Sequence, residues 1–302
     1  MVEDIEINKN RMNLDFIVSA VQKAGEKAKI NFEMEKYRDM DTSHPEVKEK
    51  SYKELVIEED YLCQEILVSG IKDHDPDSNI YSEEMNNLDL LKYDTSEVKY
   101  LIDPLDGTHN FFFGLPLWGI AVAVLNYKNI PIAGVIFLPM TDLLLKCEGI
   151  GDPTMARNDA TWQPVYTHHK QIQQALICYD NQFYKIGEKA VNIYETLVED
   201  CFTTRITGSA VCDCAFIACG KINARLWNNT NSYDIAAGIR IVEGAGGNSC
   251  DFFGNAINIF SKEVIMCSNP ELKQKLVEQI QSLEPESNTN LIERESDDKV
   301  YL

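Results

Sequence analysis

Residues 101–111 read Leu-Ile-Asp-Pro-Leu-Asp-Gly-Thr-His-Asn-Phe, an apolar run that ends in two aspartates three residues apart. The apolar run predicts a short buried strand, and the proline predicts a tight turn that carries both carboxylates, Asp103 and Asp106. Mg²⁺ prefers oxygen ligands, often a few carboxylates with water. Gly107 and Thr108 offer backbone N–H groups at the start of a helical turn, where a phosphate can bind. The stretch therefore predicts a site for a divalent cation and a phosphate. An Asp-Pro turn that only caps a helix is the alternative.

Two further segments add carboxylates to this prediction. Glu83 and Glu84 follow a short strand expected at residues 80–81, and Asp234 stands at the start of an apolar helix expected over residues 235–245. An aspartate there also suits a helix cap, which contributes about 1 kcal/mol, and Glu84 also suits the surface. The three acidic segments taken together favour one metal site.

Together these segments resemble the inositol monophosphatase family of Mg²⁺-dependent, lithium-sensitive phosphomonoesterases. The family pattern is an aspartate, then Glu-Glu, Asp-Pro-Ile/Leu-Asp-Gly-Thr, Trp-Asp and Gly-Gly. Residues 55–60 read Leu-Val-Ile-Glu-Glu-Asp and are similar to the family's Leu-Val-Thr-x-x-Asp, so Asp60 supplies the first aspartate. Asp60 precedes Glu83 by 23 residues, and Glu83 precedes Asp103 by 20, as in the family. The resemblance covers about residues 12–283, and four motifs in this order are hard to obtain by chance.

The resemblance implies a role for each matching residue. Two or three Mg²⁺ ions would be held by Glu83, Asp103, the carbonyl of Leu105, Asp106 and Asp234. The catalytic residues would be Asp60, Thr108 and Glu83. Thr108, oriented by Asp60, would position the attacking water and help to deprotonate it, without a covalent intermediate, while Glu84 would support the metal ligands from behind. The substrate would be bound by Asp106, Gly107, Thr108, Gly208, Ser209, Ala210, Asn228 and Asp234. Ser209 as a simple helix cap is the alternative for that residue.

The chain departs from the family pattern at three places. Tyr233 stands where the family has tryptophan, which keeps a large aromatic side chain beside the metal site. The family glutamate that binds sugar-like hydroxyls falls on Leu226 or Trp227 here, with Asn228 nearby, and this puts inositol specificity in doubt. His109 replaces a small polar residue, and a position beside the leaving group and a position on the surface both stay open.

The first hypothesis is therefore a Mg²⁺-dependent phosphatase that hydrolyses a small polyol or sugar-type phosphate, with inositol monophosphate as the default substrate. A second hypothesis keeps the same chemistry and changes the substrate to a nucleotide bisphosphate, fructose bisphosphate or histidinol phosphate, because of the altered residues 226–232. A third is a non-catalytic metal-binding or regulatory homologue. The pair Asp60 and Thr108 argues against the third, since a metal store has no need of a threonine that activates water.

The amino-acid composition of the chain limits the classes of partner that we expect. The chain has 302 residues with 28 Lys and Arg against 48 Asp and Glu, and 28 − 48 gives a net charge of −20. Such a charge repels nucleic acid and anionic lipid, so we expect neither as a partner. The start lacks a secretory signal pattern, and the nine cysteines contain no CxxC pair, which favours a reducing cytoplasmic location. The expected partners are a small phosphorylated metabolite and, from the resemblance, a second copy in a homodimer.

The order of expected elements indicates an α+β protein. Strands expected at residues 119–125, 132–138 and 143–147 predict an antiparallel meander, whereas the second half alternates strands and helices. The resemblance implies a layered α-β-α-β-α sandwich, the inositol monophosphatase-like (sugar phosphatase) fold. Helices are expected near 15–28 and 55–70, with a mobile charged surface segment at 33–53 between them. We expect one domain over residues 1–284, with halves at about 1–165 and 166–284, and an acidic flexible tail at 285–302.

Overall fold

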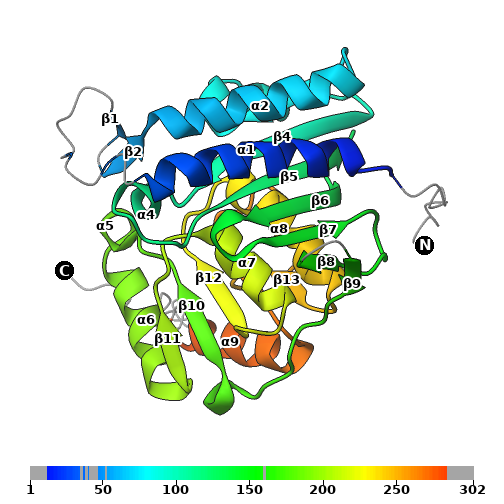
Figure 1. Cartoon of the computed structure of the whole chain (residues 1–302). Coiled ribbons are helices and arrows are strands. Elements are labelled where there is room, and N and C mark those ends of the chain that lie inside the picture. The colour runs from blue at the N-terminus through cyan, green and yellow to red at the C-terminus, as the bar shows by residue number, and fades with distance from the viewer. Residues whose placement is uncertain are drawn as a thin grey trace, which may run out of the picture.

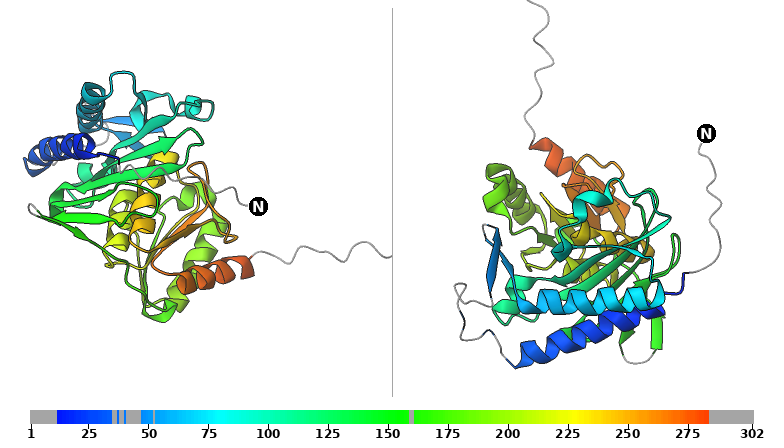
Figure 2. Two further views of the ribbon diagram at one scale, coloured as in Figure 1. Left: turned by 90° about the vertical axis from the view of Figure 1, so that its right-hand side faces the viewer. Right: turned by 90° about the horizontal axis from the view of Figure 1, so that it is seen from above.

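The computed structural model describes residues 12–34, 37, 40, 47–51, 53–158 and 161–283. The tail expected at 285–302 and part of the charged stretch 33–53 lie outside these residues. The described part of the chain forms five stacked layers, helices, sheet, helices, sheet and helices, as Figure 1 shows from one side and Figure 2 from two others. The expected layered α+β sandwich is therefore confirmed.

Two long helices cover the outer face of the larger sheet. They are α1 (Asp15–Glu33) and α2 (Glu58–His74). The predicted second helix was wrong at both ends, because Leu55 lies in a strand and Gly70 lies inside the helix. A Cβ atom on Gly70 would lie 2.9 Å from the Cβ of Ala20, so glycine at this position permits the close approach of the two helices. The pair buries one apolar core against the sheet.

The larger sheet has seven strands among the described residues. Their order is β3 (Asn79–Ser82), β4 (Val98–Asp106), β5 (Gly119–Asn126), β6 (Pro131–Leu138), β7 (Leu143–Cys147), β8 (Met155–Asn158) and β9 (Thr161–Pro164). The antiparallel meander of β5, β6 and β7 is confirmed. β3 pairs in parallel with β4, so the chain segments that follow β3 and β4 emerge at the same edge. This edge carries Glu83 and the last residues of β4, from Asp103 to Asp106.

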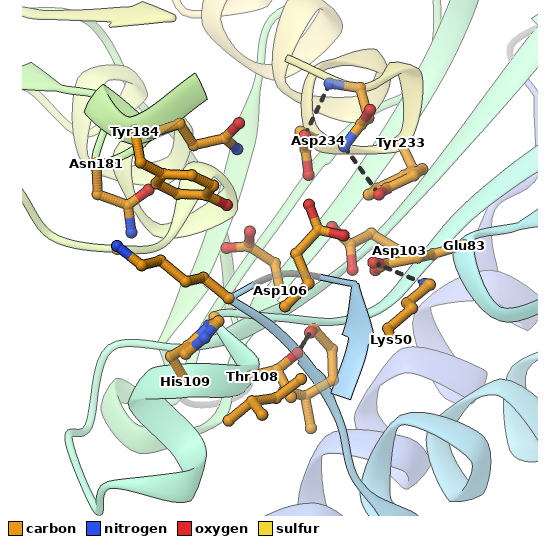
Figure 3. A pocket seen from close by; sticks show the side chains of 18 residues that line it. Lys50, Glu83, Asp103, Asp106, Thr108, His109, Asn181, Tyr184, Tyr233 and Asp234 are labelled. Atoms are coloured by element: carbon orange, nitrogen blue, oxygen red, sulfur yellow. Dashed lines mark hydrogen bonds and ion pairs between the residues drawn. The ribbon is translucent and has the colours of Figure 1, made fainter. Parts of the chain in front are cut away.

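Two helices fill the space between the sheets. They are α7 (Ala210–Ala218) and α8 (Ser232–Gly244). α8 packs so closely on β6 that a Cβ atom on Gly134 would lie 2.9 Å from the carbonyl oxygen of Ala237. Their apolar side chains share the central core with the inner face of the larger sheet. The N-terminal ends of both helices lie near the end of β4. Asp234 of α8 therefore lies close to Asp106 (Figure 3), and Ser209, just before α7, contacts the Asp106 carboxylate.

The smaller sheet has the order β11-β10-β12-β14-β13. Its strands are β10 (Leu176–Tyr179), β11 (Thr203–Arg205), β12 (Ala224–Trp227), β13 (Asn248–Cys250) and β14 (Val264–Cys267). Its outer face is covered by α6 (Glu188–Asp200) and α9 (Pro270–Ser282). β10 and β12 are parallel neighbours, so their carboxyl ends adjoin, and such edges are where open α/β sheets bind ligands.

The described part of the charged stretch only partly fits the expected surface segment, since residues 48–50 are exposed but two apolar side chains are buried. β1 (Lys48–Ser51) pairs antiparallel with β2 (Glu54–Val56), and both Tyr37 and Val47 are buried. The Tyr37 hydroxyl bonds to the buried carboxylate of Glu59, which gives this charged segment a core anchor. Short helices α3 (Leu88–Leu91), α4 (Thr108–Phe112) and α5 (Phe183–Ile186) complete the architecture. None of the described helices is both long and apolar enough to cross a membrane.

Candidate active site

The last residues of β4 place Asp103 and Asp106 on one side of the strand. The prediction of a tight turn carrying both carboxylates was wrong, because β4 continues through Asp106. Asp103 pairs with Ala121 of β5 and Asp106 pairs with Gly119, so three steps along β4 oppose two along β5. The one extra residue is a β-bulge, which bends the strand and changes which face the later side chains occupy. Asp103 and Asp106 are both buried. The bulge therefore explains how a strand with alternating side chains directs two carboxylates three residues apart into one cleft.

Gly107 connects the end of β4 to the first residue of α4, Thr108. Its φ of +86° lies in the left-handed region, and a Cβ atom there would come within 2.8 Å of the carbonyl oxygen of Leu117. A side chain would therefore be strained and would also clash. Gly107 and Thr108 both line the cleft, as predicted for a phosphate cradle, and their role in binding phosphate stays a prediction.

Three carboxylates converge at the base of the cleft (Figure 3). Oxygen atoms of Asp103, Asp106 and Asp234 all lie within 4.8 Å of one another. Both oxygens of Asp103 are buried and lack a hydrogen-bond partner among the described residues. A buried, unpaired carboxylate is costly unless a cation offsets it, so the donor set fits a hard divalent ion. Glu83 lines the same cleft from the end of the neighbouring strand.

The protonation of these groups reflects their crowding. Burial raises the pKa of Glu83 to about 8, an effect opposed by Lys50 and reinforced by Glu84. Burial also raises the pKa of Asp234 to about 7, with Asp106 adding to the effect. Burial and the neighbouring carboxylates raise the pKa of Asp103 well above its usual range. The protein alone therefore disfavours full ionisation of the cluster.

Asp106 is held from the far side by the start of α7. Its carboxylate accepts hydrogen bonds from the hydroxyl of Ser209 and from the backbone N–H groups of Ala210, at 3.2 Å, and Val211, at 3.0 Å. Ser209 also caps α7, since its hydroxyl oxygen accepts from the N–H of Cys212. Of the predicted substrate contacts at 208–210, only Gly208 is among the residues that line the cleft. Ser209 and Ala210 contact the metal-ligand candidate instead.

Asp60 and Asp234 occupy equivalent places in two different helices. Each is the third residue of its helix, and its carboxylate accepts the backbone N–H that precedes the helix, that of Ile57 at 2.7 Å or of Asn231 at 2.9 Å. Asp234 therefore caps its helix, as the alternative predicted, and also belongs to the carboxylate cluster. Capping leaves one oxygen of each carboxylate available for other contacts.

Thr108 connects Asp60 to the cleft. Its hydroxyl donates to Asp60 Oδ1 at 3.1 Å and lies 3.2 Å from the carbonyl oxygen of Leu105. Asp60 is buried behind the cleft, and burial raises its pKa well above the usual range. The predicted pair is therefore within hydrogen-bond distance, and its catalytic role stays a prediction.

The side chain of Asn228 does not line the cleft. It is buried at the end of β12, where its amide donates to the hydroxyl of Tyr179 at 2.7 Å. Trp227 and Leu226 are buried as well. A substrate contact of Asn228 therefore stays a prediction that would require the side chain to turn outward.

Several cleft residues were missed by the sequence prediction. Lys50 of β1 pairs with Glu83 at 3.2 Å and Glu84 at 2.9 Å. Asn181 and Tyr184 form the opposite wall, after β10 (Figure 3). The adjacency of two parallel strand ends could have indicated this wall, whereas the pairing of Lys50 has no signal in the sequence. The cleft has a volume of about 410 Å³, and the side chain of His109 is exposed on its rim.

Comparison with known proteins gives consistent matches. The model of the inositol monophosphatase family matches residues 10–284. Inositol monophosphatase 1 of Solanum lycopersicum is 28% identical over 280 residues, which are 89% of this chain and 94% of the relative. Nus factor SuhB of Haemophilus influenzae is 28% identical over 269 residues, 87% of this chain and 94% of the relative. A solved IMPase structure from Thermotoga maritima has a TM-score of 0.73 and 26% identity, and the match covers 89% of this chain and 96% of that one.

Proposed function

Because the chain belongs to the inositol monophosphatase family, we propose that it is a Mg²⁺-dependent phosphomonoesterase for a small polyol or sugar-type phosphate. One observation carries the proposal: both oxygens of Asp103 are buried without a hydrogen-bond partner among the described residues, beside two further carboxylates. A cation would satisfy these oxygens and offset the shared negative charge. The net charge of −20 makes a polyanionic partner unfavourable.

The proposed cation ligands are Glu83, Asp103, the carbonyl of Leu105, Asp106 and Asp234, for two or three Mg²⁺ ions. When bound, such ions stabilise the attacking and leaving oxygens of an in-line phosphoryl displacement. Thr108 Oγ1 accepts a hydrogen bond from the attacking water and donates its own proton to Asp60 Oδ1, 3.1 Å away. Because burial raises the pKa of Asp60, this carboxylate is suited to accept a proton. Glu83 faces the same cleft and completes the proposed catalytic set.

Inositol monophosphate is the first substrate we propose. A plant relative carries this activity in its name, and a cleft of about 410 Å³ can hold a ring of that size. The observation that favours a different phosphate is the burial of Leu226, Trp227 and Asn228, which offer no carboxylate to substrate hydroxyls. A nucleotide bisphosphate, fructose bisphosphate or histidinol phosphate is the second proposal.

Phosphate release from purified protein tests both. The assay compares inositol 1-phosphate, a nucleoside 3′,5′-bisphosphate, fructose 1,6-bisphosphate and histidinol phosphate, each with Mg²⁺ and with EDTA. We expect Mg²⁺-dependent release with one substrate class at least tenfold ahead of the rest. Release from none of them, in a protein that binds Mg²⁺, would favour the non-catalytic homologue, a reading that the name Nus factor of one relative keeps in view.

Three further properties belong to the proposal. We expect Li⁺ to inhibit at saturating Mg²⁺, the chain to form a homodimer, and the protein to act in the cytoplasm. A Li⁺ dose series, light scattering behind size exclusion, and fractionation of cells test them in turn.

A further inference from the structure

A buried ion pair lies beneath the wall that holds Asp106. Arg225, on β12, is 4% exposed, and its guanidinium pairs with the fully buried carboxylate of Asp213 on α7. Burial alone would lower the pKa of Arg225, but the carboxylates of Asp213 and Asp180 raise it, so the arginine stays charged. Replacing a buried pair by apolar side chains is often neutral for stability, so its presence invites a role beyond stability.

The ion pair is joined to the cleft through Thr207. The Thr207 hydroxyl donates to the same oxygen of Asp213, at 2.7 Å, and lies 3.5 Å from Arg225 Nη1. The carbonyl of Thr207 accepts from the amide of Asn110 on α4 at 2.8 Å. Thr207 is therefore fixed by its side chain from below and by its carbonyl from the neighbouring helix.

The hydrogen-bond donors to the Asp106 carboxylate described above all lie within the four residues that follow Thr207. Gly208 lines the cleft with a φ of +76°, and Ser209, Ala210 and Val211 donate to Asp106. A shift of Thr207 would therefore displace these donors together. A misplacement of this kind in a supporting residue is enough to change the affinity of a metal site.

We propose that Arg225, Asp213 and Thr207 form a positioning network that fixes the turn 207–211 and, through it, the direction of the Asp106 carboxylate toward the metal site. The inference rests on the proposed function. The three residues themselves are absent from the residues that line the cleft, so they act through the turn.

The double variant Arg225→Met/Asp213→Leu separates positioning from stability. It replaces the ion pair with apolar side chains of similar size, which is expected to keep the fold while leaving Thr207 without its partner. We expect its thermal midpoint to stay within a few degrees of the wild type. We expect its Mg²⁺ dissociation constant, measured by calorimetry without substrate, to rise at least fivefold. The Mg²⁺ activation constant should rise in parallel, while kcat at saturating Mg²⁺ changes less.

Thr207→Val provides a milder variant of the same network. It removes only the hydroxyl that joins the turn to Asp213, so the fold should survive even where the double variant does not. We expect a two- to threefold loss of Mg²⁺ affinity, and Thr207→Ser should restore the wild-type value. The matched control is Arg240→Met, since Arg240 is also buried and pairs with Glu243 at 3.2 Å, but makes none of these contacts.

The outcomes distinguish this inference from the proposed function. Wild-type affinity in both Thr207→Val and the double variant would overturn the positioning network alone, as would an equal loss in Arg240→Met. A wild-type chain that binds no Mg²⁺ would overturn both. A wild-type chain that binds Mg²⁺ but releases no phosphate would sink the proposed function, while a selective loss of Mg²⁺ affinity in the variants would still support the network.

Discussion

The two sheets contribute to the cleft in different ways. The larger sheet supplies Glu83, Asp103 and Asp106 from the ends of two adjacent strands, where the backbone is buried and the carboxylates have few alternative positions. The smaller sheet supplies Asn181 and Tyr184 from a loop and a short helix, whose side chains are exposed. The difference suggests that the first region determines the chemistry and the second selects the substrate. Substitutions in the first should therefore affect kcat, and substitutions in the second should affect KM.

The largest expected effect is that of Asp103→Asn. The amide keeps the shape but loses the charge that a cation requires, and we expect kcat/KM to fall by about 10³-fold, or about 4 kcal/mol. Phosphate release and Mg²⁺ calorimetry measure the two losses. Asp89→Asn, at an exposed position on α3, is the control and should retain full activity. Unchanged Mg²⁺-dependent turnover in Asp103→Asn would contradict the proposal of a metal site at the end of the larger sheet.

The next effect is that of Thr108→Val. The valine is similar in shape but cannot donate to Asp60 or accept from water, so we expect kcat to fall by about 10²-fold with little change in Mg²⁺ affinity. Thr108→Ser retains the hydroxyl and should recover most of the activity. If only KM changed, Thr108 would instead act in substrate binding, as proposed for Asn181 and Tyr184.

The pH dependence of stability tests the crowding of the carboxylates. The folded pKa of Glu83, about 8, lies above its ordinary value of 4.5, so the proton is bound more tightly in the folded state. Its contribution to stability is fully present below pH 4.5 and is lost as pH rises through about 8. In EDTA we therefore expect the thermal midpoint to fall across this interval. Mg²⁺ should raise the midpoint more at pH 8 than at pH 5.5, because fewer protons then compete.

Thermal melts at both pH values, with and without Mg²⁺, measure this effect. Glu83→Gln should reduce the pH dependence, since the amide does not titrate. An equal Mg²⁺ shift at pH 5.5 and pH 8 would contradict the idea that protons and cations share the site.

The smallest effects are expected on the opposite wall. Tyr184→Ala and Asn181→Ala should each change KM by about three- to tenfold, the range of one or two lost contacts, with kcat within twofold. Tyr184→Phe keeps the ring and removes the hydroxyl, so it distinguishes the contribution of the ring from that of the hydroxyl. Steady-state kinetics on two substrate classes would show whether the ratio of their kcat/KM values changes. A loss of kcat without a change in KM would break the division between the two regions.

The same division describes what could be predicted from the sequence. The segment around Asp103 combines an apolar strand, a proline and a glycine, all of which act locally, so a strand followed by a helical turn at Gly107 could be anticipated. The continuation of β4 through Asp106 with a bulge could not, because it depends on pairing with β5. The long helices and the central strands follow from apolar periodicity. β8 and β9 were missed because their side chains are largely polar or exposed and carry little alternating pattern.

The remaining parts of the site depend on contacts between distant segments. Lys185 pairs with Glu54, 131 residues away in the sequence, and this pair connects α5 to the β1–β2 hairpin. The burial of Asn228 depends on Tyr179, a neighbour only because β10 and β12 are parallel. The composition of the segment containing Lys50 predicts a surface segment, because its many charged residues outweigh the two buried residues Tyr37 and Val47.

The bulge between Asp103 and Asp106 makes the site depend on the length of one strand segment as well as on its residues. Deleting Pro104 would leave two steps of β4 opposite two of β5, and the two aspartates would still share a face because side chains alternate along a strand. Inserting one residue there, with the one-residue bulge kept, would instead leave four steps of β4 opposite three of β5 and put the two aspartates on opposite faces. Such a variant could keep its sheet, its core and all of its acidic residues, and still lose the convergence of carboxylates. A relative could therefore lose this chemistry through a single-residue insertion without any substitution at a proposed metal ligand.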